Sequence, residues 1–100
     1  MAPADPAVFA VGHRVRVRSA TGAGHVRTPR YILGKRGVIE RLCGPFRNPE
    51  QLALAAPGLP RMPLYRVRFL QREVWHDYAG APHDTLDIEL FQHWLEPDEV

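Results

Sequence analysis

A glycine-bounded segment, residues 24–37, holds the side chains with the clearest capacity for chemistry in this chain of 100 residues. A guanidinium that a tight turn holds in place can bind an anion through two hydrogen bonds and never loses its charge. The segment is therefore interpreted in two ways, as an anion-binding loop or as a solvated connector. It contains four cations, one histidine and no acid: His25, Arg27, Arg30, Lys35 and Arg36.

Other kinds of catalytic or metal site find little support in the residue types. Ser19 is the only serine and lacks the glycines of a nucleophile elbow. Cys43 is the only cysteine, which excludes an internal disulfide, and its place at the end of a predicted strand is typical of a core residue. The two His-Asp pairs at 76–77 and 83–84 form either a weak site or, as we expect, a surface loop. We predict that this chain alone is not a complete enzyme and that it binds no metal.

Two predicted strands flank the cationic segment. Residues 13–18 alternate strictly, with Val15 and Val17 on one side and three arginines on the other, which predicts a half-buried strand. Residues 37–44 form the second strand, which we expect to end at a Gly-Pro pair. The apolar residues 31–33 are expected to pack the end of the loop against the core.

The second half of the sequence predicts two further strands. Residues 64–70 and 85–90 alternate between apolar and charged side chains, with a turn at 80–84 and a short 3₁₀ turn at 91–95. Residues 45–63 contain five prolines and are predicted to form a loop with one helical turn. The apolar side chains of this loop favour burial against a partner.

Short strands joined by Gly- and Pro-containing connections, with almost no helix, indicate an all-β protein. We predict a small antiparallel SH3-like barrel with long irregular loops, in which closure of the sheet removes exposed edges. The barrel is expected to occupy residues 9–100, after a flexible N-terminal tail of residues 1–8.

The charge is small overall but unevenly placed. The formal net charge is +2, arginine supplies 12 of the 13 cations, and residues 73–99 hold most of the acids with no Lys or Arg. This separation indicates two faces with different neighbours. No stretch has the features of a leader or a membrane span, and we expect a soluble cytoplasmic protein with no membrane partner.

Several motifs occur in a fixed order between Phe9 and Pro97, and the loop Gly24-His25-x-Arg27-x-Pro29-Arg30-Tyr31 is the most diagnostic of them. The others are Phe9-x-Val11-Gly12-x-x-Val15-Arg16-Val17, Gly34-Lys35-x-Gly37-x-Ile39, Tyr65-x-Val67-x-Phe69, Glu73-x-Trp75, Asp87-Ile88-x-Leu90-Phe91 and Leu95-Glu96-Pro97. Together they resemble the C-terminal, SH3-like half of the β subunit of nitrile hydratase. The helical N-terminal half of that subunit has no counterpart here. This resembles the arrangement in thiocyanate hydrolase and in three-subunit nitrile hydratases, where the β subunit is divided into two polypeptides.

The resemblance implies a noncatalytic β-type subunit that completes the active site of an α-type subunit. In that family the α-type subunit holds Co(III) or non-haem Fe(III) through cysteine thiolates, two of them oxidised, and the enzyme converts a nitrile and water into an amide. Arg27 matches a β-subunit arginine that hydrogen-bonds the oxidised cysteines. His25, Arg30 and Tyr31 are expected to brace the loop or to lie at the partner interface. The implied partners are the α-type subunit and a separate chain equivalent to the N-terminal half of β.

Three alternatives remain beside a nitrile hydratase subunit. The first is a subunit of thiocyanate hydrolase. The second is a metallochaperone-like accessory protein, although the chain has no Cys- or His-rich tail. The third is a nucleic-acid-binding SH3-like module that uses the basic glycine loop at 34–39 and the arginines of residues 14–18. The small net charge and the acidic second half argue against nucleic acid as a partner.

Overall fold

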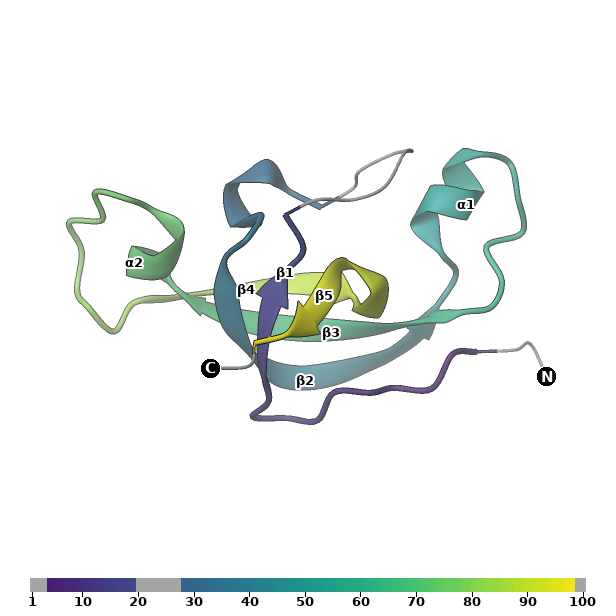
Figure 1. Ribbon diagram of the computed structural model, residues 1–100, viewed down its shortest axis with the longest axis horizontal. Coiled ribbons are helices and arrows are strands. Elements are labelled where there is room, and N and C mark those ends of the chain that lie inside the picture. The colour runs from purple at the N-terminus through teal and green to yellow at the C-terminus, as the bar shows by residue number, and fades with distance from the viewer. Residues whose placement is uncertain (1–3, 20–27, 99–100) are drawn as a thin grey trace.

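In the part of the chain that the structure describes, five strands form one antiparallel sheet with the order β4-β3-β2-β1-β5 (Figure 1). This computed structural model describes residues 4–19 and 28–98. Its strands are β1 (Arg14–Val17), β2 (Arg36–Phe46), β3 (Met62–Leu70), β4 (Thr85–Phe91) and β5 (Leu95–Pro97). Its short helices are η1 (Arg30–Ile32), α1 (Pro49–Ala53), α2 (Gln71–Val74) and η2 (Gln92–Trp94).

The predicted all-β class is confirmed, with a mainly antiparallel sheet and little helix. The sheet is not closed, because the structure gives no pairing between β4 and β5 within its described ranges. β5 is only three residues long and ends at Pro97, whose nitrogen carries no hydrogen to donate. No helix in residues 4–19 or 28–98 is long and apolar enough to cross a membrane.

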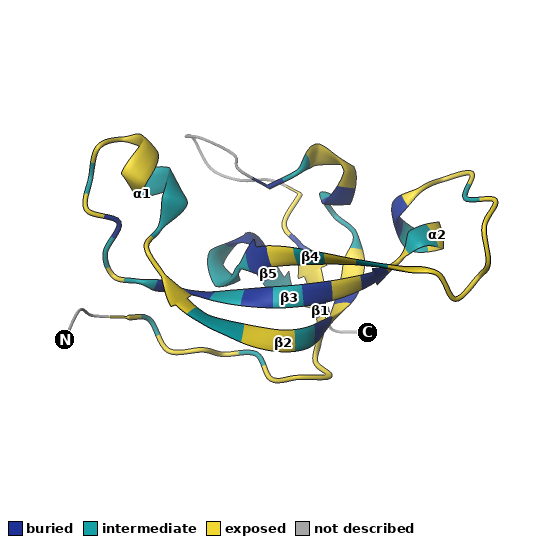
Figure 2. Ribbon diagram, turned by 180° about the vertical axis from the view of Figure 1, so that it is seen from behind, coloured by how far each residue is buried: buried dark blue, intermediate teal, exposed yellow. Residues whose placement is uncertain are grey.

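The core lies on one face of the sheet, where the predicted alternation is observed (Figure 2). Val15 and Val17 of β1 are fully buried, while the arginines between and beside them are exposed. On β3, alternate residues are likewise fully buried. The core cluster comprises Val15, Val17, Ile32, Ile39, Tyr65, Val67, Phe69, Val74, Leu90, Trp94 and Leu95.

β2 is longer than its sequence predicts. We expected it to end at residue 44, but it continues through Pro45 to Phe46, which pairs with Met62 of β3. A register shift between Leu42 and Gly44 absorbs the irregularity, and Gly44 adopts a positive φ of 125° that favours glycine.

Cys43 lies on this outer part of β2 and is only half-buried, with its Sγ 3.9 Å from Glu89 Oε2. The predicted core position of Cys43 is therefore wrong. The reason is that the part of β2 after Ile39 lies outside the core, because Gly37 and Ile39 are the buried residues of this strand.

The N-terminal segment lies along the sheet through contacts centred on Tyr65. The Phe9 ring packs edge-on against the Tyr65 ring at a centroid distance of 5.6 Å, and the Phe9 amide donates to the Tyr65 hydroxyl at 3.2 Å. That hydroxyl donates to Gln92 Oε1 at 2.7 Å, which also accepts from the Val8 amide. Asp5 N donates to the Arg61 carbonyl at 2.8 Å. The division of the chain at residue 9 stays a prediction.

The loop of residues 45–63 contains the expected helical turn, α1, which Asn48 caps through its side-chain oxygen. Glu50 of α1 reaches across to η2, where its Oε1 accepts from His93 Nε2 at 3.0 Å and from Trp94 Nε1. This contact joins residues more than 40 positions apart and fixes α1 against the end of the sheet. α1 and α2 thus lie at opposite ends of β3 (Figure 1).

Candidate functional site

The described part of the candidate loop begins at Thr28. Arg27 and His25 lie outside the described residues, so their predicted roles stay predictions. Arg30 and Tyr31 lie on η1, the 3₁₀ turn that ends the loop. Both are exposed, and neither belongs to the core.

Buried anchors fix this end of the loop. Ile32, the last residue of η1, is fully buried in the core, and Thr28, two residues before η1, is only 5% exposed. Gly34, at a positive φ of 75°, donates its amide to the Val17 carbonyl at 2.9 Å, and Val17 N donates to the Lys35 carbonyl. The expectation that residues 31–33 pack on the core therefore holds for Ile32 and in part for Leu33, but not for Tyr31.

Tyr31 instead stacks on Trp75, the residue that follows α2. Their ring centroids lie 5.2 Å apart at an interplanar angle of 22°. Tyr31 is 43% exposed and Trp75 is 41% exposed, so the pair presents aromatic surface to solvent. Tyr31 is thus a predicted candidate for bracing the loop or for the partner interface, whereas Trp75 carried no predicted role beyond its place in the Glu73-x-Trp75 motif.

Trp75 is held by Gln71, at the start of α2. The indole Nε1 donates to Gln71 Oε1 at 2.7 Å, and the Trp75 amide donates to the Gln71 carbonyl at 2.9 Å. The Gln71 side chain also donates from Nε2 to the Thr85 carbonyl at 3.3 Å, which ties α2 to β4. The Tyr31–Trp75 stack therefore joins the turn before β2 to the turn after β3. The Trp75 indole nitrogen already has an acceptor in Gln71.

The charges near this pair differ from those on the outer face of the sheet. Arg30 makes no ion pair with any described residue, and Arg36 lies 3.5 Å from Glu73 in a half-exposed pair. On the sheet, Arg68 instead donates to both carboxylate oxygens of Asp87, at 2.9 and 3.0 Å. These hydrogen bonds lower the pKa of Asp87 below its ordinary value and raise the pKa of Arg68.

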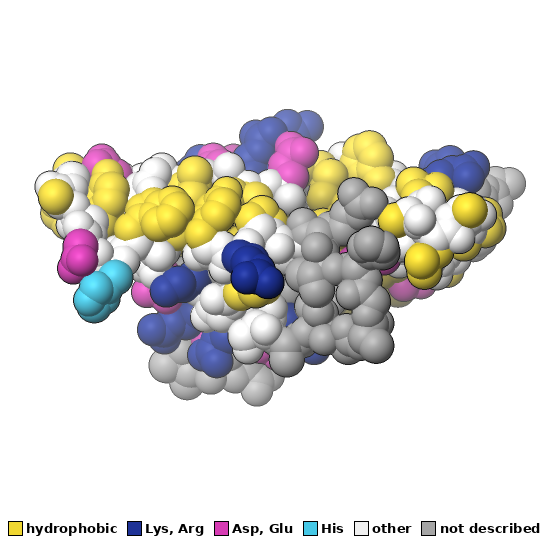
Figure 3. Space-filling view, turned by 90° about the horizontal axis from the view of Figure 1, so that it is seen from above, with side chains coloured by type: hydrophobic (Ala, Val, Ile, Leu, Met, Phe, Trp, Pro, Cys, Tyr) yellow, Lys and Arg dark blue, Asp and Glu magenta, His cyan; other side chains and the backbone are white. Residues whose placement is uncertain are grey.

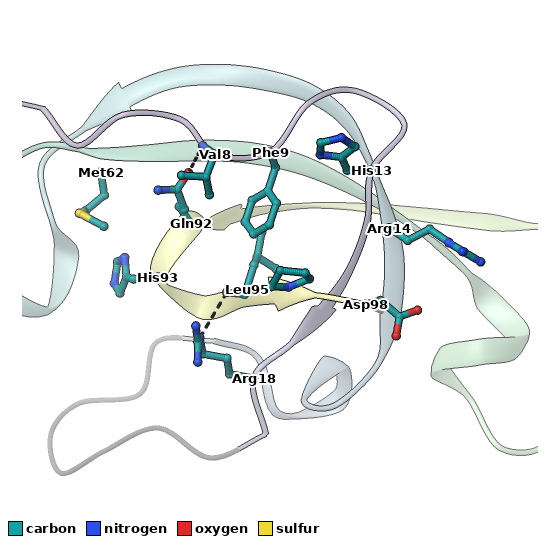
Figure 4. Close-up of a pocket in the computed structure, with 11 residues that line it drawn as sticks. Val8, Phe9, His13, Arg14, Arg18, Met62, Gln92, His93, Leu95 and Asp98 are labelled. Carbon is teal, nitrogen blue, oxygen red and sulfur yellow. Dashed lines mark hydrogen bonds between the residues drawn. The ribbon is translucent and has the colours of Figure 1, made fainter. Parts of the chain in front are cut away.

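A separate cavity of about 590 Å³ lies beside the N-terminal segment (Figure 4). Its polar side chains are used mainly to hold the fold, since Arg18 Nε donates to the Leu95 carbonyl and His13 Nδ1 accepts from the Ala10 amide. Neither Arg30 nor Tyr31, the two candidate residues that the structure describes, lines it. The lining residues are Val8, Phe9, His13, Arg14, Arg18, Met62, Gln92, His93, Leu95, Pro97 and Asp98.

Within residues 4–19 and 28–98, no three His, Cys, Asp or Glu side chains are grouped so that they could hold a metal ion. The His76-Asp77 pair lies at the surface, with both side chains more than nine-tenths exposed and 3.8 Å apart. The His83-Asp84 pair lies in the same surface loop. There the Tyr78 hydroxyl donates a hydrogen bond to Asp84, and this bond raises the pKa of Tyr78 above its ordinary value. These residues form a structural turn.

Comparison with known proteins gives a consistent set of relatives. The family described as "Nitrile hydratase beta subunit, C-terminal" matches residues 1–97. The nitrile hydratase subunit beta of Pseudomonas putida is 36% identical over 89 residues, which cover 89% of this chain and 41% of that protein. The thiocyanate hydrolase subunit alpha of Thiobacillus thioparus is 30% identical over 89 residues, covering 88% of this chain and 70% of that subunit.

A solved structure shows the same fold. The recombinant apo-enzyme of thiocyanate hydrolase from Thiobacillus thioparus matches with a TM-score of 0.84 and 29% sequence identity, over 94% of this chain and 78% of that chain. The chain spans about two fifths of the length of the nitrile hydratase β subunit that it matches.

Proposed function

The chain belongs to the family of the nitrile hydratase β subunit, C-terminal region, and from this membership we propose that it is a noncatalytic β-type subunit of a multi-subunit nitrile hydratase. The match of the family over residues 1–97 is the observation that carries the proposal. The substrate class is nitriles, which the assembled enzyme hydrates to amides. The complex would be cytoplasmic.

The contribution of this chain is a fixed cation at the edge of a partner's active site. Arg27 donates hydrogen bonds to the oxidised, anionic cysteines of the α-type subunit and so orients them. Support for this role comes from the anchored end of the loop, where Thr28 and Ile32 are buried beside it in sequence. Arginine suits the task because its forked donors match two acceptor oxygens and its charge is permanent.

The metal belongs to the α-type partner in this proposal. Cobalt or non-haem iron supplies Lewis acidity there when it is bound. This chain has a single cysteine, half-buried on β2, and a cysteine-rich metal centre cannot be built from it. We propose instead that this chain donates hydrogen bonds to the oxidised cysteine ligands of the partner's metal.

A thiocyanate hydrolase subunit is the second candidate function. It is favoured because this chain covers 70% of the Thiobacillus thioparus subunit alpha but 41% of the Pseudomonas putida β subunit. For both candidates we propose that a separate chain supplies the part equivalent to the N-terminal half of β. The two candidates share the role of Arg27 and differ in the substrate.

Affinity purification of this chain from its native cells at moderate salt tests the proposal. The co-purifying proteins are identified by mass spectrometry, and the bound metal is measured by elemental analysis. We expect a stoichiometric partner with oxidised cysteines and cobalt or iron, together with a second small chain. Assays of the complex with a nitrile and with thiocyanate then separate the two candidate substrates.

The same purification distinguishes the other classes of protein. A metallochaperone-like accessory protein would be absent from the mature, active enzyme, whereas a subunit remains in it. A nucleic-acid-binding module would carry nucleic acid that high salt removes. Either result, or the absence of any partner, would contradict the proposed function.

A further inference from the structure

β4 is an open edge of the sheet. Its seven residues pair with β3 along their whole length, and no strand in the described part of the chain pairs with their other side. We infer that this edge binds an extended segment of a different protein, in which basic and apolar residues alternate, as one more antiparallel strand. The inference does not depend on the proposed function.

The backbone on the free side of β4 is available for pairing. Apart from the pairing with β3, no hydrogen bond made by the described residues reaches the backbone of residues 86–90. An edge strand with a row of unpaired N–H and C=O groups is a template for an extended segment of another chain. The main-chain bonds would supply affinity, and the side chains of β4 would select the sequence that binds.

The outward side chains of β4 select the charge of the added strand. Asp87 and Glu89 lie on the outer face of the sheet, and each is paired with the arginine opposite it on β3. Because neighbouring strands lie about 4.8 Å apart, these carboxylates would be the nearest charges to the added strand, with the β3 arginines about twice as far away. Farther off, Glu40 and Arg41 of β2 carry opposite charges that largely cancel. Cations on the added strand are therefore attracted, and acids are repelled.

The inward side chains of β4 select apolar residues at the alternate positions. Leu86 and Ile88 are half-buried and pack against the core cluster from its edge. β4 lies above β3 in Figure 1, and the view from above in Figure 3 shows hydrophobic side chains gathered along this side, with charged side chains at its border. Apolar side chains of the added strand would cover Leu86 and Ile88, since residues that lie directly opposite in paired strands share one face.

The other edge of the sheet already contains a pairing of this kind. Residues 95–98 read Leu-Glu-Pro-Asp, and residues 86–89 of β4 repeat the pattern as Leu-Asp-Ile-Glu. β5 pairs antiparallel with β1, whose sequence Arg-Val-Arg-Val alternates in the way proposed for the partner. In that pair Arg16 Nη2 lies 3.1 Å from Asp98 Oδ1. The β1–β5 pair thus shows that a basic and apolar strand matches the pattern that β4 presents.

A second copy of this chain does not fit the edge. If two β4 strands paired antiparallel with full overlap, Asp87 of each copy would lie opposite Glu89 of the other. Like charges directly opposite one another destabilise a strand pair. β1 of a second copy has the required sequence, but it already pairs with β2 on one side and with β5 on the other. The occupant is therefore a segment of a different protein.

Binding of a synthetic peptide to the full chain tests this inference. The probe is the end-capped peptide Arg-Val-Arg-Val-Arg-Val-Arg, and NMR locates its site through amide shifts, amide hydrogen exchange and contacts between peptide and protein protons. At about 1 mM peptide we expect the β4 amides to shift and to become protected, while the β1 and β5 amides stay unchanged.

Two control peptides separate the charge of the probe from its alternation. In the first, glutamate replaces every arginine. In the second, the same residues are arranged in two blocks, four arginines followed by three valines. Both should bind at least about 10-fold more weakly, because the first opposes like charges and the second cannot place arginine and valine on opposite faces.

Substitutions on the edge give the second measurement. Asp87→Asn combined with Glu89→Gln removes both charges at nearly constant size and should weaken binding of the alternating peptide by about 10-fold. Asp5→Asn combined with Asp77→Asn is the control with the same net charge and should leave the affinity unchanged. Circular dichroism of each variant checks that the sheet is retained.

Each outcome decides the inference. Shifts and protection at β4 that require both the acids of β4 and the alternation of the peptide support it. The inference is wrong if the wild-type β4 amides do not respond, if the peptide contacts another part of the chain, or if the block peptide binds equally well. It is also wrong if the free chain dimerises through β4, which sedimentation and intermolecular proton contacts would reveal.

Discussion

Gly37 on β2 lies directly against Val67 on β3, so that a Cβ at position 37 would come within 2.8 Å of the Val67 Cγ1 atom. The same Cβ would lie 2.9 Å from the Arg68 carbonyl oxygen and 3.0 Å from the Phe69 ring. Backbone and core ring atoms cannot move aside easily in a packed interior. The close approach of β2 and β3 next to the candidate loop therefore requires glycine.

Gly37→Ala should destabilise the domain through this overpacking. We expect a loss of about 1–3 kcal/mol in the free energy of unfolding, which urea denaturation measures. Val38→Ala is the matched control on the same strand, because Val38 is 40% exposed and its truncation leaves no cavity in the core. A Gly37→Ala protein as stable as the wild type would mean that the two strands are farther apart than described.

Glu50 should contribute to stability by satisfying the nitrogens of η2. Glu50→Ala removes the acceptor for the Trp94 indole, a side chain that is 8% exposed, and for His93 Nε2. An unsatisfied buried donor costs about 1–3 kcal/mol, and we expect a loss of that size in urea denaturation. Proteolysis within residues 54–61 should also become faster, because α1 loses its contact with η2.

Glu50→Gln is the informative comparison, since its amide oxygen can still accept from the Trp94 indole. This variant should lose less stability than Glu50→Ala. Equal losses in the two variants would show that the charge of Glu50, rather than its role as an acceptor, holds α1 in place.

The Arg68–Asp87 pair predicts how stability depends on pH. Because the pKa of Asp87 is lowered in the folded state, the pair stabilises the fold above the unfolded-state pKa of about 3.9. That contribution is lost as the pH falls through the lower, folded-state pKa. Asp87→Asn should therefore lower the urea midpoint at pH 7, and the difference from wild type should disappear in strong acid.

Two controls accompany the pH measurement. Asp77→Asn changes a carboxylate whose side chain is 94% exposed and should leave the midpoint close to that of the wild type. High salt should reduce the effect of Asp87→Asn at pH 7, because both partners of the pair are partly exposed. An effect of Asp87→Asn that is constant from pH 7 to strong acid would contradict an electrostatic origin.

Local alternation was sufficient to predict the core of the sheet. Val15 and Val17 on β1, and Tyr65, Val67 and Phe69 on β3, are all fully buried as their spacing predicts. β5 was not predicted, because three residues after a 3₁₀ turn carry too little alternation to define a strand. The open edge between β4 and β5 is a property of tertiary pairing and has no local signal in the sequence.

The candidate site was less accessible to sequence reasoning than the core. Tyr31 was selected because it follows Arg30 in a distinctive loop, but its stacking partner Trp75 is 44 positions away. No spacing rule connects two residues on different turns, since their contact depends on where β2 begins and β3 ends. The available signals were the Glu73-x-Trp75 motif and the position of Trp75 in a polar segment, and the exposed fraction of the residue was needed to interpret them.

Arg27→Lys should impair the assembled enzyme without preventing its assembly. Lysine keeps the positive charge but cannot provide the two parallel hydrogen bonds that we propose Arg27 donates to the oxidised cysteines of the α-type subunit. Loss of such an outer hydrogen-bond partner typically lowers activity by about 10–100-fold, and we expect a decrease in kcat of that size in the purified complex. Arg47→Lys is the control, since Arg47 is an exposed residue that donates to the Pro57 carbonyl beside α1. Both variants should co-purify with the α-type subunit in normal amounts, so that a change in kcat reflects the site and not the assembly. Near-normal turnover of Arg27→Lys in a fully assembled complex would exclude Arg27 from the active site.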